Sequence, residues 1–251
     1  MHNMTYKTRI ISFKALVGSH NYNLATEESD KDYKVFLYPT FNDLYNMKEL
    51  SGQLQSDSDK EDITYHDVRK LYKLFTKSNI SQLEILFSSE VIKGDGLYDE
   101  LYAMRDKIAT INLKYLYDST MGMVVGLKHN IAKQYNKGDT DKVRKLTANI
   151  LRLESTLTNF WLEDFKDFGE AVRFDNESND RKRILSIREG RVSLKDSMTL
   201  QHQSELRLAE LKPKYYEKSN DSQKEIEQEI YNILYRYVRN HIEKNQMEGK
   251  Y

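Results

Sequence analysis

Two acidic residues, Asp30 and Asp32, stand where an apolar run begins in the stretch LVGSHNYNLATEESDKDYKVFLYPT. If that run is a β-strand, its side chains alternate between the two faces, so both carboxylates project to the same side. Two carboxylates held close together repel each other unless a proton or a cation neutralises them. A divalent metal is the usual cation, and ligands that are all oxygen suit Mg²⁺ or Mn²⁺. The spacing therefore predicts a metal site at the start of this strand.

A Gly-Ser pair, Gly18 and Ser19, precedes the two acids at the end of an earlier apolar run. Glycine lets a backbone approach a phosphate closely, and backbone N–H groups and the Ser19 hydroxyl can donate to triphosphate oxygens. Each motif alone is weak evidence, because Asp-x-Asp also occurs in solvated turns and helix caps. Together, with apolar strands on both sides, they favour phosphoryl transfer in which two metal ions hold the attacking and leaving oxygens.

This combination resembles the nucleotidyltransferase superfamily with a palm domain like that of DNA polymerase β. It is most similar to the predicted nucleotidyltransferases of the YcgL/RlaP type, which are associated with RNA repair. The positions that match their signature are Gly18, Ser19, Tyr22, Ala25, Ser29, Asp30, Asp32, Val35 and Phe36. At three positions the chain departs from the usual Ala, Gly and small residue, namely Asn21, Asn23 and Lys34. These departures bear on substrate fit more than on metal binding.

Later blocks extend the resemblance over most of the chain, up to about residue 200, but not over the final helices. One block is similar to a strand-helix segment of the family, and its matching residues are Asn79, Glu84, Leu86 and Phe87, with Ile80 where Pro is common. In KLTANILRL, Lys145 and Arg152 match a family helix, and Asn149 stands where His is common. The stretch ILSIREGRVSL resembles a further short element.

The resemblance implies a third carboxylate on a neighbouring strand, which would complete the metal site and help to deprotonate the attacking hydroxyl. We assign it to Asp62 in EDITYH, because Glu61 would point to the opposite face and Asp67 is placed as the cap of the next helix. The residues expected to be catalytic and to bind the metal are therefore Asp30, Asp32 and Asp62. Glu84 is interpreted as a structural acid that ties a helix to the palm, with a contribution to the site as the alternative.

Nucleotide binding is expected at Gly18, Ser19 and His20, and, through the resemblance, at Lys145 and Arg152. The last two lie about two helical turns apart and share one face, although solvated surface bases are a common alternative. A basic cluster could follow an RNA or tRNA backbone, or could be a charged loop balanced by the preceding DNESND. Its members are Arg181, Lys182, Arg183, Arg188 and Arg191.

The pattern of elements predicts an α+β fold, with a small mixed-sheet palm over residues 1–97 and an all-helical domain over residues 98–251. Strands are expected from Arg9 to Ser19, from Asp32 to Pro39 and in EDITYHDV. FNDLYNMKELSGQL is expected to be a short helix and loop. After residue 97 we expect helices that are punctuated around Gly122 and end at Gly138. The last expected element is an amphipathic helix in QKEIEQEIYNILYRYVRNHIEKN.

The composition of the 251-residue chain is that of a globular protein, with 39% hydrophobic and 31% charged residues. The net charge is zero, so the overall charge gives no argument about nucleic acid. There is no cysteine, which excludes disulfides and thiolate metal sites. No segment reaches the roughly 20 apolar residues of a membrane span, so a cytoplasmic protein without a membrane partner is expected.

The expected function is an enzyme that moves a nucleoside monophosphate from an NTP, with ATP as first choice, to an acceptor hydroxyl. An RNA or tRNA end is favoured as acceptor through the resemblance alone. One alternative keeps the chemistry but transfers the nucleotide to a protein or a small molecule. The other is a degenerate palm that serves as a non-catalytic binding scaffold, against which the intact Asp30 and Asp32 argue.

Overall fold

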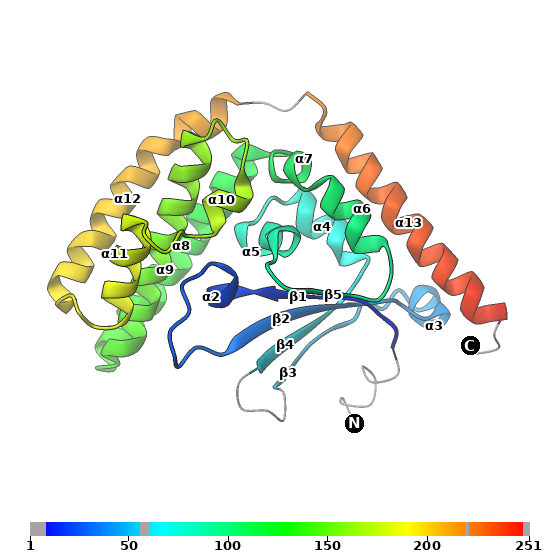
Figure 1. Cartoon of the computed structure of the whole chain (residues 1–251), viewed down its shortest axis with the longest axis horizontal. Coiled ribbons are helices and arrows are strands. Elements are labelled where there is room, and N and C mark those ends of the chain that lie inside the picture. The colour runs from blue at the N-terminus through cyan, green and yellow to red at the C-terminus, as the bar shows by residue number, and fades with distance from the viewer. Residues whose placement is uncertain (1–8, 56–60, 219–220, 248–251) are drawn as a thin grey trace. The chain divides into compact units, whose positions relative to one another are not determined.

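The computed structural model describes residues 9–55, 61–218 and 221–247 of the chain (Figure 1). Cα packing divides the chain into two compact units. We name the first the sheet unit, which comprises the described residues of Met1–Asn21, Ala25–Ile111 and Asn220–Tyr251. The second, the helical unit, comprises Tyr22–Leu24 and the described residues of Asn112–Ser219. The chain thus enters the helical unit for three residues between the Gly-Ser turn and the two acids.

The described strands of the sheet unit form a five-stranded mixed sheet with the order β3-β4-β2-β1-β5. The strands are β1 (Ile11–Val17), β2 (Lys31–Leu37), β3 (Ser51–Gln55), β4 (Glu61–Asp67) and β5 (Val91–Lys93). β2 and β4 run parallel, and the other neighbours are antiparallel. β-Branched and aromatic residues of β1 and β2 fill the core, for example Phe13 and Phe36, whose rings stack with centroids 4.7 Å apart. The predicted α+β fold, a small mixed sheet followed by helices, is confirmed.

Short helices cover one face of the sheet, as Figure 1 shows for α4, α5 and α6. The helical elements of the sheet unit are α2 (Gly18–Asn21), α3 (Phe41–Tyr45), α4 (Lys70–Thr76), α5 (Ile80–Leu83), the 3-10 helix η1 (Glu84–Phe87), α6 (Leu97–Ala103), α7 (Arg105–Ala109) and α13 (Gln223–Met247). α3 begins with a capping box between Thr40 and Asp43. α13 packs against α4 and α6, so the predicted amphipathic tail helix buries its apolar face within the sheet unit.

The helical unit consists of long helices around α9. Its helices are α8 (Leu113–Asn136), α9 (Thr140–Leu162), α10 (Phe168–Val172), α11 (Asn179–Arg188) and α12 (Leu194–Glu217). Each starts with a polar side chain that accepts a backbone N–H, for example Asp139 from Lys142 at the start of α9. α9 packs against all four of the others, and a continuous run of its residues from Ile150 to Leu157 is buried. The core of this unit therefore forms around one helix.

Several local expectations were wrong, each for a physical reason. Asp67 does not cap α4: it ends β4, is fully buried, and accepts hydrogen bonds from the backbone and side chain of Arg69. Gly122 does not interrupt a helix but lies inside α8, where a long packed helix tolerates the cost of about 1 kcal/mol. The actual breaks fall at Met104 and at Thr110–Asn112. β3 and β5 were missed because they are short edge strands without an alternating apolar pattern.

The division into packing units differs from the domain boundary expected after residue 97. α6 and α7 stay with the sheet unit, and α13 belongs to it although it is last in sequence. The predicted domains, residues 1–97 and 98–251, remain a prediction about which segments fold independently. None of the described helices is long and apolar enough to cross a membrane.

Candidate active site

Asp32 and Asp62 are brought together by strand register. Asp32 in β2 is the Cα partner of Asp62 in the neighbouring parallel strand β4. Register partners on adjacent strands project their side chains to the same face, so two carboxylates share one edge of the helix-covered face. Asp30 is exposed and immediately precedes β2. The sequence predicts that an acid at the start of one strand lies beside a third carboxylate on a neighbouring strand. Asp32 and Asp62 are adjacent in this way.

Glu61 lies on the opposite face of the sheet. Its carboxylate forms an ion pair with Lys14 Nζ at 3.5 Å, and that Lys14 ammonium lies 3.6 Å from the centroid of the Tyr33 ring. Tyr33 directly follows Asp32 in β2. Because successive side chains of a strand point to opposite faces, the Tyr33 ring lies on the face opposite to the Asp32 carboxylate. Two adjacent acids in β4 thus face in opposite directions, which makes Glu61 a control for Asp62.

Gly18 lets the Gly-Ser turn approach Asp32. Its φ is +72°, in the left-handed region that favours glycine, and a Cβ there would lie 2.4 Å from Asp32 Oδ2. Gly18 thus leaves space at the Asp32 carboxylate that any other residue would fill. The Gly18 N–H, which was expected to donate to a phosphate oxygen, instead donates to Glu84 Oε2 at 3.0 Å. Ser19 follows within the short helix α2.

Glu84 is a buried acid behind the turn, with 3% of its surface exposed. It lies in η1 and connects that element to the Gly18 amide, as the structural interpretation of this residue expects. Lys34 projects to the same face as Asp32 and donates to the Ser81 carbonyl and, at 3.2 Å, to Gln82 Oε1. Burial lowers the pKa of Lys34, while the negative charges of Glu84 and Asp32 act in the opposite direction. Lys34 therefore places its amino group near Asp32 and Glu84.

The two histidines of this region have structural contacts. A ring nitrogen of His20 lies 3.0 Å from the Ser29 carbonyl oxygen, which closes the loop between the Gly-Ser turn and Asp30. His66 in β4 stacks on Phe36 with ring centroids 5.4 Å apart. Burial, aided by the positive charges of Lys34 and Lys70, lowers the pKa of His66 to about 4. His66 is therefore neutral at physiological pH.

Lys145 and Arg152 lie on α9 in the helical unit. Lys145 is exposed, whereas only 5% of Arg152 is exposed. The Arg152 guanidinium donates through Nε to Asn149 Oδ1 at 2.8 Å and lies 4.3 Å from the centroid of the Tyr22 ring. Its Nη1 is buried and has no hydrogen-bond partner among the described residues. A buried guanidinium with an unused donor is a feature expected of an anion site.

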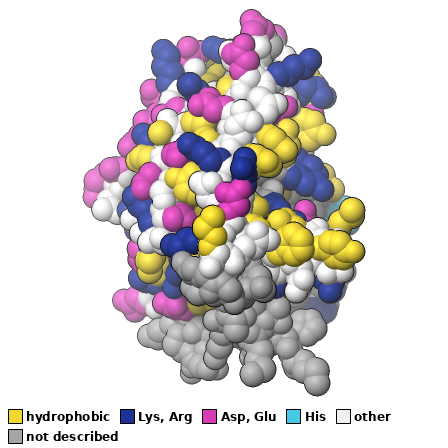
Figure 2. Space-filling view, turned by 90° about the vertical axis from the view of Figure 1, so that its right-hand side faces the viewer, with side chains coloured by type: hydrophobic (Ala, Val, Ile, Leu, Met, Phe, Trp, Pro, Cys, Tyr) yellow, Lys and Arg dark blue, Asp and Glu magenta, His cyan; other side chains and the backbone are white. Residues whose placement is uncertain are grey.

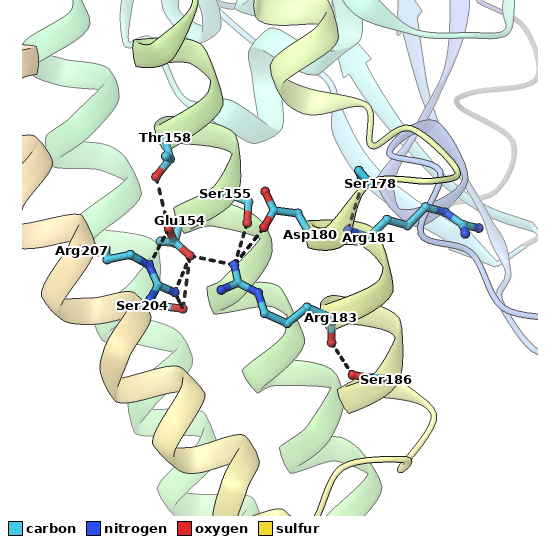
Figure 3. A network of polar contacts seen from close by, with 10 residues as sticks. All are labelled: Glu154, Ser155, Thr158, Ser178, Asp180, Arg181, Arg183, Ser186, Ser204 and Arg207. Carbon is cyan, nitrogen blue, oxygen red and sulfur yellow. Dashed lines mark hydrogen bonds and ion pairs between the residues drawn. The ribbon is translucent and has the colours of Figure 1, made fainter.

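Each residue of the basic cluster has a partner within the chain. Lys182 pairs with Glu177 at 2.8 Å, and Arg191 pairs with Glu189. Figure 3 shows Arg183 pointing to Glu154, Ser155 and Asp180, with distances of 3.1, 3.1 and 3.2 Å. The remaining two members donate to main-chain carbonyls, Arg181 to that of Asn23 and Arg188 to that of Leu24. The cluster is therefore largely committed to internal contacts.

Oxygen ligands that suit a divalent metal are present, since Asp32 and Asp62 are paired in register beside the space left by Gly18. As the side chains stand, no three His, Asp or Glu residues of the described part of the chain are grouped closely enough to hold a metal ion. The metal-binding trio Asp30, Asp32 and Asp62 therefore remains a prediction.

Sequence reasoning gave no role to Lys34 or Glu154, because a lysine in a strand and a glutamate in a helix carry no spacing signal.

Comparison with known proteins gives a family. The model of the RNA repair pathway DNA polymerase beta family matches residues 2–167, which is more than half of the chain. A solved structure of a nucleotidyltransferase-like protein from Exiguobacterium sibiricum 255-15 is similar at a TM-score of 0.34 and 9% identity. The match covers 95% of this chain and 88% of that chain. A search of the curated proteins finds no match.

Proposed function

We propose a reaction for this chain on one premise: the chain belongs to the RNA repair pathway DNA polymerase beta family. The proposed reaction is metal-dependent transfer of a nucleoside monophosphate from an NTP, with ATP as first choice, to an acceptor hydroxyl. The acceptor oxygen bonds to the α-phosphorus, and the bond from the α-phosphorus to pyrophosphate, which leaves, is broken. The acceptor that we propose first is an RNA or tRNA end, because the family is described by RNA repair.

The observation that carries this proposal is the register of Asp32 with Asp62 beside Gly18. We propose that Asp30, Asp32 and Asp62 hold Mg²⁺ or Mn²⁺. When bound, such ions stabilise the charge that develops on the attacking and leaving oxygens of an in-line displacement. Asp62 is proposed in addition to accept the proton of the acceptor hydroxyl.

The Gly-Ser turn is proposed to orient the triphosphate. The Ser19 hydroxyl is the proposed donor to phosphate oxygens, because the Gly18 amide already donates to Glu84. The role of Gly18 is then to leave space at Asp32 rather than to supply an N–H. His20 is proposed to hold the loop through Ser29, and Lys145 and Arg152 are proposed to bind anionic groups of the nucleotide.

The test is transfer of label from ATP, CTP, GTP and UTP, with Mg²⁺ and either total RNA or lysate protein. Asp32→Asn and Asp62→Asn keep the size of each side chain but remove its charge, so we expect transfer to fall at least about 100-fold. Glu61→Gln is the matched control, because Glu61 is next to Asp62 but on the opposite face, paired with Lys14. If the Asp variants label acceptors as well as the wild type, or if nothing is labelled, the proposal fails.

A second candidate acceptor is a protein or a small molecule. The internal pairing of the basic cluster favours it, because these residues are engaged by the chain and less available to a nucleic-acid backbone. The same labelling experiment separates the acceptors. Label that is lost on ribonuclease treatment indicates RNA, and label that is lost on protease treatment indicates protein. A new labelled product that stays soluble after acid precipitation and separates from the NTP on chromatography indicates a small molecule.

A further inference from the structure

Three residues that follow the Gly-Ser turn are held by helical-unit residues that are far away in sequence. The segment Tyr22–Leu24 belongs to the helical unit, whereas the residues on both sides of it belong to the sheet unit. All three of its carbonyl groups accept a hydrogen bond. The donors are the Phe174 N–H to Tyr22 O at 3.0 Å, Arg181 Nε to Asn23 O at 2.8 Å, and Arg188 Nη1 to Leu24 O at 2.8 Å.

The side chains of this segment are held as well. Asn23 Nδ2 donates to the Phe174 carbonyl and to Asn176 Oδ1, both at 2.9 Å. Its φ is +61°, a left-handed conformation in which Asn is the best tolerated residue after Gly. The buried Tyr22 ring lies under the Arg152 guanidinium. The segment is thus fixed through its backbone and its side chains.

Two of the hydrogen bonds to the segment Tyr22–Leu24 come from Arg181 and Arg188, which the sequence had suggested as contacts for a nucleic-acid backbone. Arg181 and Arg188 each direct one of the five guanidinium donors to a main-chain carbonyl of the same short segment, which orients both side chains toward it. Both arginines lie beyond residue 167, where the match to the family model ends. The part of the chain outside the matched range therefore holds a segment inside the signature motif.

We propose that Arg181 and Arg188 are positioning residues that fix the loop between Ser19 and Asp30, and that they are not a nucleic-acid contact. By holding the carbonyls of Asn23 and Leu24, they restrict the conformations of the peptide that links the turn to the acids. The inference adds a role to the proposed active site, but its first readout is loop order and needs no activity.

The experiment compares two double variants of the same cluster. Arg181→Met with Arg188→Met removes the two donors to the loop and keeps the aliphatic stems. Lys182→Met with Arg191→Met is the matched control, because it removes the same charge from bases that pair with Glu177 and Glu189. Hydrogen exchange of loop amides between residues 19 and 30 is the first readout. The second is kcat and KM for the NTP, determined separately.

We expect the loop amides of the Arg181/Arg188 variant to exchange about tenfold faster or more, because the loop opens locally when its carbonyl contacts are lost. The control should exchange like the wild type. Where transfer is measurable, kcat should fall only in the Arg181/Arg188 variant. In both double variants, RNA affinity should fall by a similar small factor through net charge alone.

Unchanged exchange of the loop in the Arg181/Arg188 variant would overturn the inference. A loss of RNA affinity and a shallower salt dependence in that variant alone would assign the arginines to nucleic acid instead. If the double variant does not fold, the single variants Arg181→Met and Arg188→Met give the same comparison, because each removes one of the two donors to the loop. Loop exchange as slow as that of the wild type in both single variants would overturn the inference. If no transfer is ever detected, the proposed reaction fails while exchange still decides this inference.

Discussion

At the scale of single residues, the three departures from the family signature each have a bonding partner. Asn21 is buried and its Oδ1 accepts the Ser89 N–H at 2.9 Å. Asn23 holds a left-handed turn and bonds the segment after Phe174. Lys34 donates to the start of α5. The substituted residues therefore make contacts that Ala, Gly or a small residue could not make, and those of Asn21 and Asn23 hold the stretch after the Gly-Ser turn in place.

Gly18 gives the sharpest residue-scale prediction. Gly18→Ala would place a Cβ 2.4 Å from Asp32 Oδ2 at a φ of +72°, so it should destabilise the sheet unit by about 1–3 kcal/mol and abolish nucleotide transfer. Urea unfolding followed by far-UV circular dichroism measures the stability. Gly122→Ala is the control, because nothing lies within 4 Å of the added Cβ inside α8. It should be neutral or stabilise by up to about 1 kcal/mol.

The comparison of the two glycines decides the interpretation. Similar stability of Gly18→Ala and the wild type would mean that the turn does not approach Asp32 as closely as the geometry states. Loss of stability in both variants would instead point to a general sensitivity to side chains at glycine positions.

At the scale of elements, α9 is connected to α11 and α12 by one buried carboxylate. Glu154 is 3% exposed and accepts from Arg207 Nε at 3.0 Å, from Arg183 Nη2 at 3.1 Å and from Ser204 Oγ at 3.3 Å (Figure 3). The hydrogen bond between Arg207 and Glu154 is the main reason why the pKa of Arg207 lies above its usual value. The three helices thus share one charge network, in which the acid is the central member.

Removal of the central acid should cost more than removal of any surface pair. Glu154→Leu leaves the Arg183 and Arg207 guanidiniums without their buried counter-charge, so we expect about 3–5 kcal/mol of destabilisation of the helical unit. Glu177→Gln, which breaks the exposed pair with Lys182, should change stability by at most about 0.5 kcal/mol. Urea unfolding of both variants checks this, and equal midpoints would show that the network contributes no net stability.

At the scale of the whole molecule, the order of elements in the sequence and their order in space differ at two places. The segment Tyr22–Leu24 leaves the sheet unit early in the chain, and α13 returns to it at the end. Figure 2 shows Lys and Arg side chains interspersed with Asp and Glu on one face, so the distribution of charge there does not indicate which elements pack together. The apolar residues of α13 are the reason for its return, since Ile226, Ile230 and Leu234 are buried.

Deletion of α13 is therefore expected to unfold the sheet unit first. A chain that ends at Ser219 loses the burial of five apolar side chains of α13, each worth about 1.5–3 kcal/mol, namely Ile226, Ile230, Ile233, Leu234 and Ile242. It also loses the hydrogen bond of the Tyr237 hydroxyl to Glu100 Oε1 at 2.8 Å. Hydrogen exchange should then become fast in β1 and β2 while α9 stays protected. A chain that ends at Met247 is the control.

The outcome of this deletion distinguishes the packing units from the predicted domain boundary after residue 97. Fast exchange in the sheet after deletion of α13 supports the packing units. Unchanged exchange in β1 and β2 would support a palm that folds from residues 1–97 without the last helix, as the sequence predicts.

The sequence by itself determined the local features of the fold and of the candidate site. Alternation along β4 is a property of any strand, so it was enough to separate Asp62 from Glu61, and the apolar run after Asp32 placed that acid at the start of a strand with Asp30 just before it. Polar caps and apolar periodicity likewise predicted α9 from Asp139 onward and the last helix. These signals depend on a few neighbouring residues and are therefore readable without a structure.

Only the tertiary structure decided which distant groups meet. Every residue offers a carbonyl and most offer an N–H, so no spacing in the sequence tells that Arg181 and Arg188 bond Asn23 and Leu24, or that Glu84 accepts the Gly18 amide. Such partners are selected by packing over the whole chain. The short edge strands and the return of α13 were hidden for the same reason, because they are stabilised by neighbours far away in sequence.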